Sequence, residues 1–111
     1  MPQNIAERDW KILRDLHDEL IERSRELSLE KVSRLLADSK KTSRERYVDI
    51  KELMKEEDED FAVAIDDLRR STALLKLAAM VYRKLLSDEE LSRFSPETRV
   101  AVDRLMGAFR D

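Results

Sequence analysis

The chain has no cysteine, one histidine, one glycine and two prolines among its 111 residues. Without cysteine it forms no disulfide and offers neither a thiolate nucleophile nor a sulfur ligand for zinc. The one glycine, Gly107, rules out a P-loop and a dinucleotide-binding loop, because both need several glycines. The lack of cysteine also fits a reducing compartment, so we expect a cytoplasmic protein.

Long apolar runs are missing as well. The most apolar stretch, residues 73–86, contains Lys76 and ends in a region with Arg83 and Lys84, well short of the roughly 20 residues that span a bilayer. The N-terminus has no basic start followed by an apolar run, so we expect no secretion signal and no membrane association. A net charge of −3 with both signs interleaved gives no overall attraction to nucleic acid.

Charged residues make up 42% of the chain and hydrophobic residues 41%. Long amphipathic helices satisfy both numbers, because each has one face for the core and one for water. Few helix breakers and no alternating strand pattern point the same way. We therefore predict an all-α fold, an elongated bundle of four to five helices that forms a single domain over residues 1–111.

Two long helices are predicted in the N-terminal half. The first covers about residues 5–38, with Asn4 as its N-cap, and a pause in its apolar stripe leaves open a bend near 24–28. The second covers 43–70 and begins with a capping box formed by Thr42 and Glu45. Its apolar positions recur every seven residues, at Tyr47, Met54, Phe61 and Leu68. Such spacing keeps one face toward a partner helix.

The heptad register continues through an acidic run, residues 56–60, and on into the apolar segment. One rod or two helices with a hinge at 70–72 are both consistent with it, and we favour the hinge. The apolar helix is predicted at 72–86, buried on all sides because eleven of the fourteen residues from 73 to 86 are apolar.

Two further helices complete the prediction. A short turn is expected at 88–92, after a capping box formed by Ser87 and Glu90. A final helix at 96–108 begins with Ser95 as N-cap and Pro96 at the first helical position. Judged by their lengths, the short helices would pack end to end along the long ones.

The function predicted first is that of a non-enzymatic interaction or scaffold protein, in which the apolar stripe and the acidic helix make protein contacts. The heptad positions and the apolar helix present more apolar surface than the other helices of one chain are expected to bury. A homodimer or another protein partner is therefore predicted. The predicted interface lies on the apolar helix, at Leu74, Leu77, Val81 and Tyr82.

A second hypothesis starts from two carboxylate pairs three residues apart, Glu19 with Glu22 and Glu57 with Asp60. This spacing points both carboxylates to one side of a helix, and oxygen ligands suit magnesium. The arrangement resembles the all-α nucleoside triphosphate pyrophosphohydrolases, and the resemblance implies a magnesium-dependent nucleotide hydrolase. It is limited to these four residues, without a matching phosphate-side pattern, so we favour a solvated acidic face and expect no cofactor.

Two other interpretations are weaker. The helices around 93–95 can be compared with a helix-turn-helix, with Arg99, Arg104 and Arg110 available for phosphates, but acidic residues surround these arginines and disfavour nucleic-acid binding. His17 is interpreted as an ordinary histidine at a helix surface.

Overall fold

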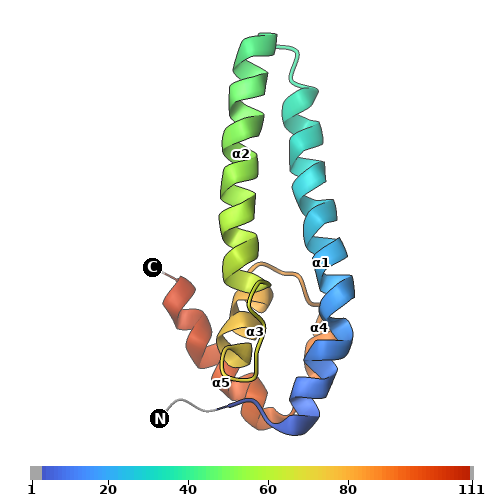
Figure 1. The fold of residues 1–111 in the computed structure, drawn as a ribbon, viewed down its shortest axis with the longest axis vertical. Helices are drawn as coiled ribbons and strands as arrows, with labels where there is room; N and C mark the ends of the chain where they lie inside the picture. Colours follow the sequence, from blue (N-terminus) through green and yellow to red (C-terminus); the bar gives the residue numbers. More distant parts are fainter. Residues whose placement is uncertain (1–3, 111) are drawn as a thin grey trace.

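A computed structural model describes residues 4–110 of the chain. No strand occurs within this range, and the predicted all-α fold is confirmed. The elements in chain order are α1 (Glu7–Leu36), α2 (Ser43–Ala64), α3 (Ala73–Tyr82), α4 (Asp88–Ser92), α5 (Pro96–Met106) and a 3-10 turn, η1 (Gly107–Phe109). The two long helices form an antiparallel hairpin, and the short helices gather at its open end (Figure 1).

The molecule therefore has two parts. We call the outer hairpin, residues 24–61, the arm, and the remainder, residues 4–23 and 62–110, the head. All fully buried apolar side chains belong to the head: Ile5, Leu13, Leu16, Leu20, Ala64, Ile65, Ala73, Leu77, Ala78, Ala79, Met80, Leu85, Phe94 and Val102. No arm residue is fully buried. The two parts thus differ in how they are stabilised.

The first long helix is unbroken across the position where a bend was left open. The Ser28 hydroxyl lies 3.2 Å from the Ser24 carbonyl and 2.8 Å from the Glu57 carboxylate, and it donates to these acceptors. It thus bridges to α2 without interrupting the helix. The prediction that Asn4 caps α1 is wrong. Ala6 occupies the N-cap position and makes no side-chain capping bond.

The second helix begins at the predicted capping box but ends at Ala64, six residues before the predicted end. Ile65 explains the early stop. It follows Met54 by eleven residues, three helical turns, so a continued helix would point it to the same exposed side as Met54. Because the helix ends first, Ile65 reaches the core with 2% of its surface exposed. The two helices are thus separate, as favoured, but the break covers residues 65–72 rather than 70–72 and includes Leu68.

The third helix lies in the head core, but the prediction that it is buried on all sides is wrong, because Leu75 is 49% and Tyr82 42% exposed. It also ends four residues before the predicted end. The Leu85 amide donates to the Met80 carbonyl at 2.9 Å, and the Lys84 amide to the Val81 carbonyl at 3.0 Å. These two bonds form a Schellman motif. The motif places Lys84 in the left-handed region, with φ of 61°.

The short turn at 88–92 and the final helix beginning at Pro96 lie where they were predicted. Their packing differs from the prediction. Instead of lying end to end along the hairpin, α3 and α5 pack against each other at one end of it. The molecule measures 51 × 26 × 22 Å, and its radius of gyration is 16.3 Å. A compact chain of this length would have about 13 Å. The excess reflects the projecting arm.

Candidate functional site

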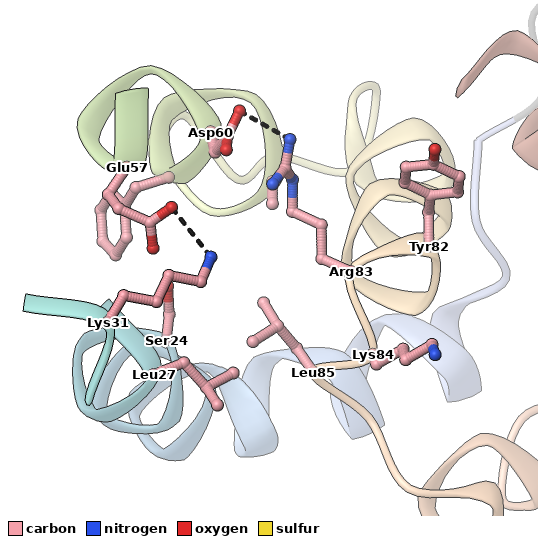
Figure 2. Close-up of a pocket in the computed structure, with 11 residues that line it drawn as sticks. Ser24, Leu27, Lys31, Glu57, Asp60, Tyr82, Arg83, Lys84 and Leu85 are labelled. Atoms are coloured by element: carbon pink, nitrogen blue, oxygen red, sulfur yellow. Dashed lines mark hydrogen bonds and ion pairs between the residues drawn. The ribbon is translucent and has the colours of Figure 1, made fainter. Parts of the chain in front are cut away.

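A cleft lies on one side of the hairpin, where the end of α3 meets α1 and α2 (Figure 2). Its volume is about 440 Å³. Polar and charged side chains from all three elements alternate with apolar ones around it, among them Lys31, Glu57, Asp60, Arg83 and Leu85. A cleft with this lining is a first candidate for a binding site.

Both carboxylates in the cleft are paired with cations, and Lys84 is a third cation in its lining. Lys31 Nζ lies 3.1 Å from Glu57, and Arg83 lies 2.6 Å from Asp60 (Figure 2). Burial alone would raise the pKa of the Glu57 carboxyl, but hydrogen bonds from Ser28 and Lys31 outweigh it and hold the pKa below its usual value. Each carboxylate in the cleft thus has its own cation, and the pairs join α2 to its neighbours.

The acidic run is accordingly used within the chain. Three of its five acids pair with other elements: Glu57 with Lys31, Asp58 with Arg25 at 3.3 Å, and Asp60 with Arg83. Arg25 also lies over the Phe61 ring, 3.8 Å from its centroid, a cation–π contact. Internal neutralisation is the reason that five adjacent acids are tolerated in one helix.

The four candidate magnesium ligands are not brought together. Glu57 lies opposite Ser28, whereas Glu19 is nine residues, about 13 Å, further along α1. Glu19 instead pairs with Arg23 at 3.2 Å. Within residues 4–110 there is no group of three or more acids or histidines arranged to hold a metal ion. The geometry therefore gives the magnesium hypothesis no assembled site.

The candidate interface on the apolar helix is placed largely inside the head. Leu77 is fully buried, Leu74 and Val81 are half-buried, and Tyr82 is 42% exposed with its ring stacked on Phe109 at 5.5 Å. Leu77 therefore has no surface to offer a partner. His17 lies half-buried on α1.

The helix-turn-helix comparison also finds little geometric support. The first of its two helices, α4, has only five residues, and Phe94 between them is buried in the core. Arg93 pairs with Glu89 at 2.8 Å, while Arg99 and Arg104 are exposed on α5.

The arm carries a surface of exposed apolar side chains. Six apolar side chains lie on one face of the hairpin, which we call the arm face: Leu29, Val32, Leu36, Tyr47, Ile50 and Met54. Leu29 is 65% exposed and Tyr47 73% exposed. Leu29, Val32 and Met54 together line a shallow apolar hollow of about 150 Å³. Large hydrophobic side chains gathered on one face of a thin two-helix arm are typical of an interaction surface.

The sequence contained the signal for the arm face in two halves. Leu29 and Leu36 are seven residues apart on α1, and Tyr47 and Met54 seven apart on α2. Only the hairpin shows that the pairs share one face, since the turn at 37–42 sets how far each helix is shifted along the other. The most apolar segment of the sequence is 73–86, and for that reason the interface was predicted there and not on the arm.

Two buried carboxylates hold the head together: Asp9, which no sequence motif singles out, and Glu90, whose capping box with Ser87 predicts only the start of a helix. Asp9 is fully buried and accepts hydrogen bonds from the Ser95 amide at 3.0 Å, the Ser95 hydroxyl at 2.5 Å and the Thr98 hydroxyl at 2.6 Å. Burial raises the pKa of Asp9, but these bonds more than compensate and keep the pKa below its usual value. Asp9 thereby ties the start of α5 to α1.

Glu90 ties α4 to α1 in the same way. Arg23 on α1 donates to both of its carboxylate oxygens, at 2.7 and 3.1 Å, and also to the Leu85 carbonyl. The Arg23 hydrogen bond, together with the Ser87 amide, lowers the pKa of Glu90 to about 2. Both carboxylates are structural anchors.

Comparison with protein-family models, with curated proteins and with solved structures finds no match to this chain. Within residues 4–110, no helix combines the length and the apolar character needed to cross a membrane. The arm face and the cleft are therefore the observations from which a function can be inferred.

Proposed function

We propose that this is a non-enzymatic helical interaction protein that binds other protein chains through its arm face. The observation that supports the proposal is a difference between the two parts of the molecule. The head contains all the fully buried apolar side chains, although Val100 on α5 is 52% exposed. The arm fully buries none and leaves Leu29, Leu36, Tyr47 and Met54 each more than half exposed. A bound protein would bury these side chains, which are exposed in the monomer.

The arm is suited to this role by the way it is held. Its two helices are joined by ion pairs and polar contacts, such as Arg25 with Asp58 and Ser28 with Glu57, rather than by a buried apolar seam. Four of the six side chains of the arm face are thereby left exposed, whereas Val32 and Ile50 are half-buried. An aromatic residue, Tyr47, together with methionine and leucine, is a composition common in protein interfaces.

A photo-crosslinking amino acid placed at position 54 tests the proposal in living cells. Position 63 is the matched control, because Val63 is also exposed on α2 but lies nine residues, two and a half turns, from Met54 and so points the opposite way. We expect discrete protein adducts from position 54 and none above background from position 63. Equal or absent adducts at both positions would contradict an interaction role for the arm face.

A further inference from the structure

We propose that the occupant of the arm face is a second copy of this chain, with the two arms parallel and related by a two-fold axis along their length. The two hairpins then form a four-helix bundle in which α1 of each copy packs against α2 of the other. This inference rests on the proposed function and names the partner of the same surface.

The position of the head leaves the arm face open to a second arm. Leu20 and Leu29 lie on α1 nine residues apart, two and a half turns, and so point in opposite directions. Leu20 is fully buried in the core of the head, and Leu29 is 65% exposed. The head therefore packs on one side of the hairpin, and the arm face looks to the other side. Two copies can meet there without their heads colliding.

The available area is sufficient for a stable dimer. The arm part of α2, residues 43–61, is about 28 Å long, and two helices side by side are about 18 Å wide. Such a face buries roughly 500 Å² per copy, or about 1,000 Å² in total, which reaches the lower bound for a specific interface. The monomer also exposes more surface than a typical monomer of its mass. Its accessible area is 7770 Å², against about 6,400 Å² for a typical monomer of its mass.

Charges along the two edges of the arm face select a copy of the chain as the partner. Helical spacing places Glu22, Glu26 and Glu30 along the outer edge of α1, and Arg44, Lys51 and Lys55 along the outer edge of α2. Asp58 also lies near the edge of α2, but it is paired with Arg25 within the chain. Apart from this pair, one edge is acidic and the other basic. Within residues 4–110, Glu26 and Lys55 form no ion pair, so both remain available to a partner.

The same charges determine the direction of packing. A two-fold axis along the arm brings the acidic edge of one copy over the basic edge of the other and keeps each residue at its own height. Because Leu29 and Met54 lie at one height in the hairpin, Glu26 would come within about one turn of Lys55 in the second copy. An axis across the arm would instead place acidic edge on acidic edge, which like-charge repulsion disfavours.

Sedimentation velocity of the full chain at concentrations from about 1 to about 100 µM tests the association. We expect a dimer with a dissociation constant in the micromolar range, and a loss of affinity of at least about 100-fold for Met54→Glu, because a charge would be buried in the interface. Val63→Glu, on the opposite side of α2, is the control and should dimerise normally. Circular dichroism should show the same helix content in both variants.

Charge reversal tests the direction of packing. Glu26→Lys and Lys55→Glu should each weaken the dimer about tenfold, because the two-fold axis repeats each repulsion. Mixing the two variants should restore association, since positions 26 and 55 would then carry opposite charges at both contacts of the mixed dimer. Failure of the mixture to recover affinity would contradict the parallel arrangement.

The outcomes separate this inference from the proposed function. A chain that remains monomeric at the highest concentration while position 54 still crosslinks to other proteins overturns the second copy as occupant and leaves an interaction role intact. A monomer without crosslinks overturns both proposals. Dimerisation of Met54→Glu as tight as that of the unmodified chain would place the interface away from the arm face.

Discussion

Asp9 is the residue on which the head depends most. Its carboxylate lies in the core and is the common acceptor for the amide and hydroxyl of Ser95 and the hydroxyl of Thr98. A buried charge is costly unless it is fully hydrogen-bonded, and here three donors from the start of α5 satisfy it. The start of α5 is therefore anchored by one side chain that lies far away in the sequence.

We expect Asp9→Ala to lower the free energy of unfolding by about 3 kcal/mol, because three buried donors lose a charged acceptor. Asp9→Asn should cost less, since one carbonyl oxygen remains. Asp15→Ala, an exposed site on the same helix, serves as the control and should change stability by less than about 0.5 kcal/mol. Urea denaturation followed by circular dichroism measures all three. A similar small effect at both positions would show that Asp9 is not an anchor.

Glu90 should make stability depend on pH. Its pKa is about 2 in the folded chain and 4.5 ordinarily. Since the folded value is the lower one, the stabilisation is complete well above the ordinary pKa and is lost as pH falls toward the folded one. It amounts to roughly 3 kcal/mol, of which about 2 kcal/mol should be gone at about pH 3.

The check compares Glu90→Gln with the unmodified chain by urea denaturation at about pH 6 and about pH 3. The variant should be less stable at the higher pH and should lose less stability on acidification. Glu89→Gln, whose side chain is 70% exposed, is the matched control and should retain the ordinary difference between the two pH values. An unchanged pH response in Glu90→Gln would rule out the Arg23 pair as its source.

At the scale of the elements, the end of α3 is a site of backbone strain. Lys84 holds the left-handed conformation that glycine adopts freely, because the Schellman motif requires it there. We expect Lys84→Gly to stabilise the protein by about 1 kcal/mol and Lys84→Ala to leave it nearly unchanged. The comparison of the two variants, by thermal or urea denaturation, separates the backbone effect from loss of the lysine side chain. Equal stability of both would argue against strain.

The arm and the head should also open independently. Arm residues lack full burial, whereas Ala73, Leu77 and Met80 of α3 have no exposed surface. In hydrogen exchange at low micromolar concentration, arm amides should exchange through local opening and α3 amides only through global unfolding. Protection of the arm should increase with protein concentration if a second copy covers it. Met54→Glu should abolish that increase.

For the whole molecule, the arrangement of the dimer determines its length. Parallel arms keep both heads at one end, so the longest dimension stays near the 51 Å of one chain. Opposed arms would add a second head, about 15 Å or more, judged by the length of α3. Small-angle X-ray scattering of the dimer distinguishes the two, and a markedly longer particle would contradict the parallel packing.

Local patterns in the sequence were sufficient to predict where most of the helices begin. The capping boxes at Thr42 and Ser87 and the start at Ser95 and Pro96 depend on near neighbours in the chain, so they predicted where α2, α4 and α5 begin. The ends of α2 and α3 depend on where Ile65 and Leu85 find the core, and that is decided by residues distant in the chain. Helix ends were therefore the weaker part of the prediction.

The sequence by itself determined an all-α chain with long amphipathic helices and a central apolar helix, because periodicity and capping are local properties. Only the tertiary structure decided which apolar residues are covered. It buried Leu77 and left Leu29 and Met54 exposed, since burial depends on which helices meet and on which side. It also paired Glu57 and Asp60, two of the candidate magnesium ligands, with a lysine and an arginine from other helices or their ends. The arm face is thus a property of the hairpin, although both halves of its pattern were present in the sequence.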